Sequence, residues 1–155
     1  MPCAQINIDT LEHARGTLLS HYTSLSTHSQ RSRFCGPVSE QGLRTFLEKP
    51  RQGIAFALTL DDDVIGVCEL VYTSPKCAEV GISIIDSHQG QGFGQKLVQE
   101  CLHYAQKKGL TEATFYFDKG NSSIRSLLSS MNAKITYDGR DGNATVFLTP
   151  HFKKN

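Results

Sequence analysis

The sequence has little charge imbalance, no long apolar segment near its start and no closely spaced cysteine pair, and each absence excludes a class of function. Its 16 Lys and Arg and 15 Asp and Glu give a formal net charge of +1. No basic run is longer than two residues, so we expect no nucleic acid as a direct partner. The N-terminal segment lacks an apolar core and contains Asp9 and Glu12, which predicts neither a signal peptide nor a membrane span.

The five cysteines are odd in number and show no Cys-x-x-Cys spacing. This pattern is typical of free thiols in a reducing compartment, so we expect a cytoplasmic protein. Cys68 and Cys101 are expected in the core rather than at a zinc ion or as nucleophiles. Three aspartates at 61–63 separate two expected strands, where a solvated hairpin tip is commoner than a metal site. The sequence therefore predicts no metal.

The chain of 155 residues has the length of one domain, and 39% hydrophobic with 20% charged residues is typical of a globular protein. Strand and helix patterns alternate along it. We therefore expect a single α/β domain over residues 1–155 with a mixed sheet. The expected strands lie at 4–8, 54–60, 64–72, 77–85, 113–117, 135–137 and 145–148.

Helix boundaries are predicted from capping residues. Asp9 with Glu12 resembles a capping box before a first helix, and Ser39 is a cap for a second helix. A third helix follows the glycine-rich segment near residue 90, and Gly109 is expected to end it. Asn121 or Ser122 caps the last helix, which Asn132 ends in the left-handed conformation.

The most informative stretch runs from Cys77 to Leu102. Apolar residues at every second position from Val80 to Ile84 predict a half-buried strand. The Ile84-Ile85 doublet breaks the alternation, which marks either the end of the strand or a β-bulge that separates it from a neighbour. A glycine-rich turn then leads directly into an amphipathic helix.

The turn itself reads Gln89-Gly90-Gln91-Gly92-Phe93-Gly94. Glycines at alternate positions allow several backbone N–H groups to converge at the positive end of the helix, as an anion-binding turn requires. A tight turn also needs glycine for steric reasons alone, so the spacing by itself leaves both interpretations open. The three-residue step of a dinucleotide-binding loop is absent, and no lysine followed by Ser or Thr forms a P-loop.

The order of apolar strand, Gln89-x-x-Gly92-x-Gly94 and helix resembles the acetyl-coenzyme A signature of the GNAT superfamily of N-acetyltransferases, Arg/Gln-x-x-Gly-x-Gly/Ala. The resemblance covers nearly the whole chain. It implies a mostly antiparallel sheet that is splayed at the cofactor strand and carries helices on both faces. It also implies transfer of an acetyl group from acetyl-coenzyme A, as cosubstrate, to an amine.

The resemblance further implies which residues bind acetyl-coenzyme A. The pyrophosphate is assigned to the backbone of Gln89, Gly90, Gln91, Gly92, Phe93 and Gly94, with Phe93 mainly packing. The backbone of Ile84 and Ile85 is assigned to the pantetheine arm. Asn121-x-x-Ile124-x-x-Leu127 looks like the family's second cofactor motif, whose asparagine bonds the same arm. The alternative is that Asn121 only caps its helix, and one asparagine can do both.

A second resemblance concerns the acceptor. Leu25-Ser26-x-x-Ser29 followed by Arg33-Phe34, with a helix opening at Val38-Ser39, resembles bacterial protein lysine acetyltransferases of the Pat type. It implies a protein lysine as acceptor, with a small-molecule amine as the alternative. Arg33 and Phe34 are equally well explained as an ion pair and a hydrophobic plug. We expect the first two helices and the loop between the closing strands to form the acceptor pocket.

Glu79 is the candidate catalytic base, because an amine must be neutral before it attacks a thioester and a free lysine is mostly protonated at pH 7. GNAT enzymes often place a catalytic glutamate on this strand. Glu69 is the rival. A hairpin that turns around Ser74 places the two carboxylates opposite each other, which raises the pKa of one. The alternative for Glu79 is a solvated residue without a catalytic role.

Two departures from the family pattern limit the interpretation. Leu128 lies where many GNAT enzymes have a tyrosine that protonates the leaving thiolate, and Met131-Asn132-Ala133 replaces the usual Gly-Phe. The missing tyrosine also fits the Pat type, because a thiolate with a pKa near 8.5 leaves without help. A non-catalytic module that senses acetyl-coenzyme A is therefore an alternative. The sequence does not distinguish a monomer from a dimer.

Overall fold

The computed structural model describes residues 3–148, and residues 1–2 and 149–155 of the expected domain lie outside the described part. The elements follow in the order β1 (Ala4–Thr10), α1 (Arg15–Ser24), α2 (Thr27–Phe34), α3 (Glu40–Glu48), β2 (Gly53–Leu60), β3 (Asp63–Ser74), β4 (Cys77–Ile84), η1 (Asp86–His88), α4 (Phe93–Lys107), β5 (Glu112–Asp118), α5 (Ser122–Ser130), β6 (Lys134–Asp138) and β7 (Asp141–Phe147).

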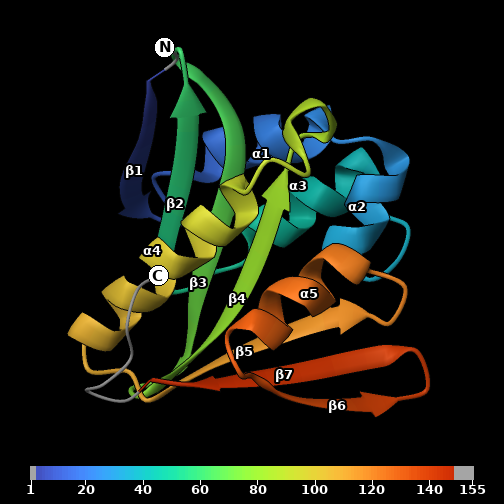
Figure 1. Ribbon diagram of the computed structural model, residues 1–155. Coiled ribbons are helices and arrows are strands. Elements are labelled where there is room, and N and C mark those ends of the chain that lie inside the picture. The colour runs from blue at the N-terminus through green and yellow to red at the C-terminus, as the bar shows by residue number, and fades with distance from the viewer. Residues whose placement is uncertain (1–2, 149–155) are drawn as a thin grey trace.

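Seven strands form one sheet in the order β1-β2-β3-β4-β5-β7-β6. Every neighbouring pair is antiparallel except β4 and β5, which are parallel. Helices α4 and α5 cover one face, and α1, α2 and α3 cover the other (Figure 1). The expected α/β fold, with a mixed and mostly antiparallel sheet between helices on both faces, is confirmed.

The sheet is splayed between its two parallel strands. Pairing of β4 with β5 runs only from Cys77–Glu79 against Glu112–Thr114, whereas β4 remains paired with β3 as far as Ile84. Beyond Glu79 the two strands diverge, and Figure 1 shows the opening between them. The expected splay at the cofactor strand is thereby confirmed. Among residues 3–148, it leaves one edge of the second half of β4 without a strand partner.

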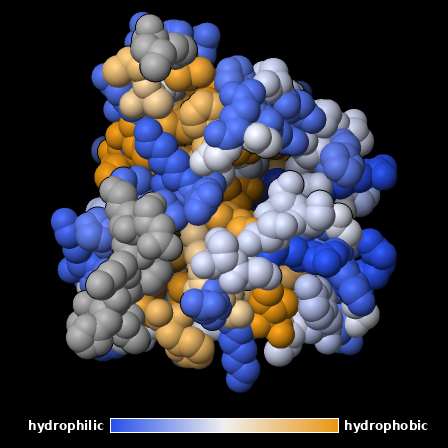
Figure 2. All heavy atoms as spheres, viewed as in Figure 1, coloured by the Kyte–Doolittle hydropathy of each residue, from blue (hydrophilic) through white to orange (hydrophobic). Residues whose placement is uncertain are grey.

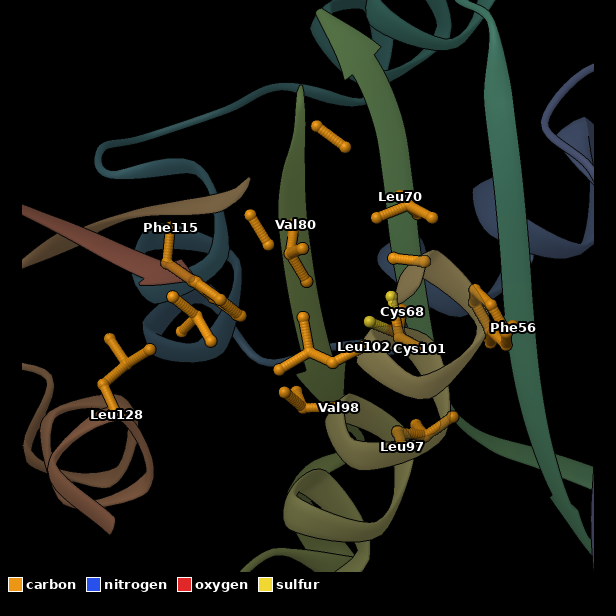
Figure 3. Packing of buried hydrophobic residues seen from close by; sticks show 14 of the residues in the cluster. Phe56, Cys68, Leu70, Val80, Leu97, Val98, Cys101, Leu102, Phe115 and Leu128 are labelled. Atoms are coloured by element: carbon orange, nitrogen blue, oxygen red, sulfur yellow. The ribbon is translucent and has the colours of Figure 1, made fainter. Parts of the chain in front are cut away.

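Two hydrophobic cores hold the layers together, one on each face of the sheet. The larger lies under α4 and α5, where Val98 and Leu102 point toward Val80 of β4 and Leu128 lies toward Phe115 (Figure 3). The apolar side chains of α4 recur at helical spacing, so that one face of the helix is buried. The smaller core joins α1 and α3 to β2 and β3. The expected core positions Cys68 and Cys101 are fully buried, and both thiols are free.

Most predicted caps and turns are confirmed. The hydroxyl of Ser39 accepts a hydrogen bond from the Gly42 N–H at 3.0 Å, and the side chain of Asn121 accepts one from Ile124 N–H at 3.2 Å. Gly109 has a φ of 86° and Asn132 a φ of 56°, as expected after a helix. The aspartates at 61–63 lie at the hairpin between β2 and β3.

The first helix begins later than predicted. Asp9 lies in β1, which continues to Thr10, and α1 begins only at Arg15, so the capping-box prediction was wrong. Instead, Thr10 accepts a hydrogen bond from the His13 N–H at 3.1 Å in the turn that follows. The strand prevails because all seven residues of β1 pair with β2, which a local helix cap does not outweigh. The sequence analysis also missed α2.

Residues 3–148 contain no candidate for a membrane span or for a metal site. No helix in this range is long and apolar enough to cross a membrane. Within the same residues, no group of three or more His, Cys, Asp or Glu side chains is arranged to hold a metal ion.

Candidate active site

A cleft of about 830 Å³ occupies the opening between β4 and β5. It is lined from one face of the sheet by the start of α4 and by α5, and from the other by α2, Phe46 and Arg51. Seen from the side of α4 and α5, hydrophobic residues are exposed at the bottom of the hollow between the two helices (Figure 2). The cleft therefore passes through the splayed sheet and connects its two faces.

The glycine-rich turn lies at the mouth of this cleft. Gly90 and Gly92 have φ values of 76° and 87°, which residues with a Cβ adopt only at a cost. Gly92 precedes α4, and the first intrahelical bond runs from the Lys96 N–H to the Gly92 carbonyl at 3.1 Å. The amides of Phe93, Gly94 and Gln95 precede that bond, so the turn presents free N–H groups at the positive end of the helix, which suits a phosphate.

The Gln89 side chain braces the turn. Its amide donates to the Ile84 carbonyl at 2.9 Å and to the Ser29 hydroxyl at 3.0 Å. Its backbone N–H is directed at the Asp86 carbonyl at 3.4 Å, which leaves phosphate contacts to the later amides of the turn. Gln91 is exposed and does not line the cleft.

The same brace reaches α2, which the sequence analysis did not predict. The Asp86 carboxylate accepts hydrogen bonds from the Ser26 N–H at 3.0 Å, the Ser26 hydroxyl at 2.7 Å and the Ser29 hydroxyl at 3.0 Å. The Ser26 bonds, more than those of Ser29, hold the pKa of Asp86 below its ordinary value. The Leu-Ser-x-x-Ser pattern thus joins the glycine-rich turn to the start of α2.

The unpaired edge of β4 offers backbone groups to the cleft. The Ile85 N–H donates to the Ile65 carbonyl of β3 at 2.8 Å, so by strand alternation the N–H groups of Ile82 and Ile84 point to the open edge. The Ile84 carbonyl on that edge is already bonded to Gln89. The Ile85 carbonyl accepts from the His88 N–H at 3.0 Å, and Ile85 does not line the cleft. Ile82, which sequence reasoning missed, therefore has the freest backbone.

Asn121 and Leu128 lie at different depths of α5. Asn121 lines the cleft while it caps the helix, so its side chain is close enough for the second role that the sequence analysis left open. Leu128 is fully buried in the larger core and does not line the cleft. The side chain at this position therefore serves packing.

Glu79 lies at the last paired rung of β4 and β5, where the strands begin to diverge. It is exposed and lines the cleft. Its side chain points to the same face of the sheet as Gly81 and Ser83, toward α2 and away from α4, because alternate residues of a strand share a face. The carboxylate is thus placed where the two halves of the cleft meet.

Glu69 has a different environment, and the predicted pairing with Glu79 was wrong. Glu69 is opposite Gly81, whereas Glu79 is opposite Val71, because the hairpin is tighter than expected and shifts register between Tyr72 and Ser74. Glu69 is fully buried and forms ion pairs with Arg33, at 3.0 Å, and with Arg51.

The environment of Glu69 also opposes a role as base. Burial raises the pKa of its carboxyl group, but Arg33, Arg51 and the hydrogen bond from the Tyr22 hydroxyl outweigh burial and lower the pKa. The pKa increase that the sequence analysis expected from repulsion is therefore absent. A carboxylate that is held charged by two guanidinium groups is a poor proton acceptor, which leaves Glu79 as the candidate.

Aromatic side chains and one glycine fix the two arginines. A Cβ at position 81 would lie 2.3 Å from the Nη2 atom of Arg33, so the guanidinium group occupies the space that the glycine leaves over β4. The Cζ atom of Arg33 lies 4.7 Å from the centre of the Phe34 ring, and that of Arg51 lies 4.3 Å from the centre of Phe46. Arg33 and Phe34 therefore combine the ion pair and the plug that the sequence analysis proposed.

His21 of α1 adds one more polar contact at β4. Its Nε2 atom lies 2.8 Å from the Ser83 hydroxyl, and its Nδ1 atom is buried without a hydrogen-bond partner among the described residues. Burial, reinforced by the charge of Arg33, lowers the pKa of His21 from 6.5 to about 4. The imidazole is consequently neutral at pH 7 and adds no charge to the cleft.

The structure thus brings most of the predicted residues to one cleft. Of the predicted set, Glu79, Ile84, Gln89, Gly90, Gly92, Phe93, Gly94 and Asn121 line it, and Ile85 and Gln91 do not. Arg51 and Ile82 were missed, since neither belongs to a motif. Of the elements expected to form the acceptor pocket, α3 contributes Phe46 to the lining, whereas α1 and the loop between β6 and β7 do not contribute.

Comparison with known proteins agrees with this geometry. The family model described as an acetyltransferase (GNAT) domain matches residues 10–134. The N-acetyltransferase YvbK of Bacillus subtilis, itself uncharacterised, is 35% identical over 77 residues. That match covers 49% of this chain and 48% of YvbK, so the chain spans about half the length of this curated relative.

Solved structures share the fold at low sequence identity. The GNAT domain of S. lividans PAT superimposes with a TM-score of 0.77 and 19% identity, over 94% of this chain and 90% of that one. Spermidine N-acetyltransferase from Vibrio cholerae, determined with CoA and spermine, gives a TM-score of 0.71 and 18% identity, over 93% and 96%. The family match over most of the chain, together with the splayed sheet and the glycine-rich turn, shows that this chain belongs to the GNAT acetyltransferase family.

Proposed function

We propose that the protein is an N-acetyltransferase that moves an acetyl group from acetyl-coenzyme A to a primary amine, with Glu79 as the general base. The observation that carries this proposal is the position of Glu79. It is an exposed carboxylate on the last paired rung of β4, inside a cleft that has an anion-binding turn at its mouth. The amine and the thioester approach this point from opposite faces of the sheet.

Acetyl-coenzyme A supplies the acetyl thioester. The amides of the turn at Gly92 to Gly94 are the proposed pyrophosphate site, with Gln89 bracing the turn and Gly90 shaping it. The open edge of β4 at Ile82 and Ile84 is the proposed site of the pantetheine arm, and Asn121 is a further donor or acceptor beside it. The Ile82 N–H is the proposed hydrogen-bond donor to the thioester oxygen as negative charge develops there.

The transfer reaction needs few further groups from the protein. Glu79 takes a proton from the acceptor ammonium, directly or through water, and the free amine attacks the carbonyl carbon. A C–N bond forms, the C–S bond breaks, and the sulfur leaves with the bonding electron pair. The second proton that the nitrogen loses on becoming an amide goes to the thiolate or to water. Because a thiol has a pKa near 8.5, the thiolate is an adequate leaving group without an acid at Leu128.

The acceptor, the compartment and the extent of the domain are further parts of the proposal. A protein lysine is supported by the similarity of α2 to Pat-type enzymes, and a small-molecule amine is the alternative. A cytoplasmic location and a single domain over residues 1–155 stay predictions from the sequence. A non-catalytic sensor is the competing function, and the exposed Glu79 in the cleft favours the enzyme.

The test is release of coenzyme A thiol from acetyl-coenzyme A with a panel of amines and lysine peptides, for the wild type and for Glu79→Gln. We expect the variant to lose roughly 10²-fold or more in kcat/KM, because a positioned base contributes about that factor. Glu12→Gln, an exposed glutamate outside the cleft, is the matched control and is expected to retain full activity. Equal activity of Glu79→Gln would contradict the assignment of the base, and tight cofactor binding without turnover would favour the sensor.

A further inference from the structure

Positive and negative side chains lie at different points of the cleft lining. They are Arg33, Arg51 and Glu79, and the lining contains no other Asp, Glu, Lys or Arg among the described residues. Glu69 lies behind the two arginines, fully buried, and neutralises one of the two positive charges. Arg33, Arg51 and Glu69 together therefore carry one net positive charge, and Glu79 carries the balancing negative charge at a separate point of the cleft.

Hydrogen-bond donors of both guanidinium groups remain free. The bonds of Arg33, to Glu69 at 3.0 Å and to the Tyr22 hydroxyl at 3.3 Å, both use Nη2, and the bond of Arg51 to Glu69 uses Nη1. The Nε atoms of both arginines are buried without a partner among residues 3–148. These Nε atoms have almost no accessible surface. The donors left for an anionic ligand are therefore the other terminal nitrogens, Nη1 of Arg33 and Nη2 of Arg51, in side chains that line the cleft and are 13% and 15% exposed.

The donors are also held rigidly. The guanidinium group of Arg33 fills the space over Gly81, and both groups rest on aromatic rings whose centres, at Phe34 and Phe46, lie 5.4 Å apart. Arginine presents its donors as a planar fork that matches a carboxylate. Because packing and Glu69 have already fixed this fork, little conformational entropy is lost when a carboxylate binds to it.

The two arginines lie within a short reach of Glu79. Gly53 pairs with Val71, and Val71 pairs with Glu79, so Gly53 and Glu79 are two strand spacings, roughly 10 Å, apart. Arg51 lies two residues before Gly53 in the chain. Arg33 covers Gly81, two residues or roughly 7 Å along β4 from Glu79. Both arginines contact Glu69, which is opposite Gly81 on the face of the sheet away from Val80 and α4. The proposed phosphate site lies at the start of α4, so we do not expect the phosphates of acetyl-coenzyme A to be their ligand.

We propose that the acceptor is a small amino acid or amino-acid-like amine, whose carboxylate binds Arg33 and Arg51 while its amino group faces Glu79. This inference rests on the proposed N-acetyltransferase function and names its substrate class. The charge separation of such a molecule matches that of the cleft. Its ammonium group would lie at Glu79, and its carboxylate at the net positive cluster of Arg33 and Arg51. The transfer step is that described above, and the carboxylate is unchanged by it.

A protein lysine fits this arrangement less well. The groups next to a lysine side chain in a polypeptide are neutral amides, which leave the free guanidinium donors with weaker partners. A polyamine adds a second positive charge close to Arg33 and Arg51, which is repelled. Both remain measurable outcomes of the test.

The first experiment compares acids with their carboxamides. Amino acids and ω-amino acids, among them 4-aminobutanoate and 6-aminohexanoate, are assayed beside the corresponding amides, lysine peptides and spermidine. In the two ω-amino acids the carboxyl group is far enough from the amine that acid and amide have similar amine basicity. We expect the best acid to exceed its amide by at least tenfold in kcat/KM, as charge-assisted hydrogen bonds predict. Equal rates, or a preference for peptides or spermidine, would overturn the proposal.

The second experiment uses variants and readouts that separate binding from folding. Arg51→Gln and Arg51→Lys are expected to raise the KM for the acid and to reduce its advantage over the amide to less than threefold, with the KM for acetyl-coenzyme A unchanged. Arg44→Gln, on α3 and half exposed, is the matched control and keeps the preference. A rise confined to the KM for acetyl-coenzyme A would overturn the proposal, because the arginines would then serve the cosubstrate.

A binding measurement separates this inference from the proposed function. Calorimetry of N-acetyl-6-aminohexanoate and of its amide with the wild-type protein, in the presence of coenzyme A, needs no turnover. Acid-selective binding without turnover of any amine would remove the proposed function and retain the carboxylate site. Turnover together with equal binding of acid and amide would retain the transferase and remove the carboxylate site.

Discussion

The two faces of β4 are built from different materials. On the side of α4, the strand and helix form an apolar core, and the proposed cofactor site consists of backbone amides and glycines. On the side of α1 to α3, a buried polar cluster of Tyr22, Arg33, Arg51 and Glu69 packs against the same strand at Gly81. A site made of backbone is therefore encoded locally, whereas a site made of side chains depends on elements that are distant in the sequence.

The difference also predicts where substitutions harm folding and where they harm binding. Substitutions at a site made of backbone remove little buried contact. We therefore expect such variants to lose function with little loss of stability. The polar cluster is part of the folded core, so its variants lose both. The following three predictions test this contrast from the largest expected effect to the smallest.

Glu69→Gln is expected to lower the free energy of unfolding by roughly 3–5 kcal/mol, because it leaves two buried guanidinium groups without their shared carboxylate. The same isosteric change at the exposed Glu79 is expected to alter the free energy of unfolding by less than about 0.5 kcal/mol. Urea denaturation of both variants measures the difference. Similar stabilities for the two would show that the buried cluster does not support the fold.

The second prediction concerns pH and His21. Its pKa is about 4 in the folded protein and near 6.5 when unfolded, so below pH 6.5 the unfolded chain binds a proton that the folded protein does not. The contribution of His21 to the free energy of unfolding is therefore fully present above pH 6.5 and is lost as the pH falls. Between pH 6.5 and 5 the decrease attributable to His21 is roughly 2 kcal/mol.

The measurement is urea denaturation at pH 7, 6 and 5 for the wild type, His21→Gln and His13→Gln. His21→Gln is expected to show a smaller decrease between pH 7 and 5 than the wild type. His13→Gln, which changes a histidine whose side chain is 74% exposed, is expected to follow the wild type. Parallel curves for all three proteins would contradict a buried neutral imidazole at His21.

The third prediction compares two glycines on opposite sides of the site. Gly92→Ala strains a φ of 87° by roughly 1–2 kcal/mol and is expected to raise the KM for acetyl-coenzyme A several-fold. Gly81→Ala places a Cβ against Arg33 and is expected to raise the KM for the acceptor instead. Steady-state kinetics with both substrates varied separates the two. Variants with the same kinetic defect would show that the faces of β4 are not functionally distinct.

Most features that depend on neighbouring residues were predicted correctly from the sequence, whereas several that depend on distant residues were not. The turn from Gln89 to Gly94 was found because its spacing, the strand before it and the helix after it are all local. The splay was expected only through the family resemblance, because no residue of β4 indicates by itself that pairing with β5 ends at Glu79. The register of Glu69 was predicted incorrectly, because the β3–β4 hairpin turns between Ser74 and Cys77 rather than around Ser74, and the position of the turn sets every later pair.

The sequence by itself determined the alternation of strands and helices, the cap at Ser39 and the glycine-rich turn before a helix, because hydrophobic period, capping side chains and left-handed glycines act over a few residues. Only the tertiary structure decided that Glu69 is locked in ion pairs while Glu79 is exposed. It also decided that Arg33 and Arg51, from separate segments, share one carboxylate and face one cleft. Charge and burial depend on partners that folding brings together, and local sequence does not specify those partners.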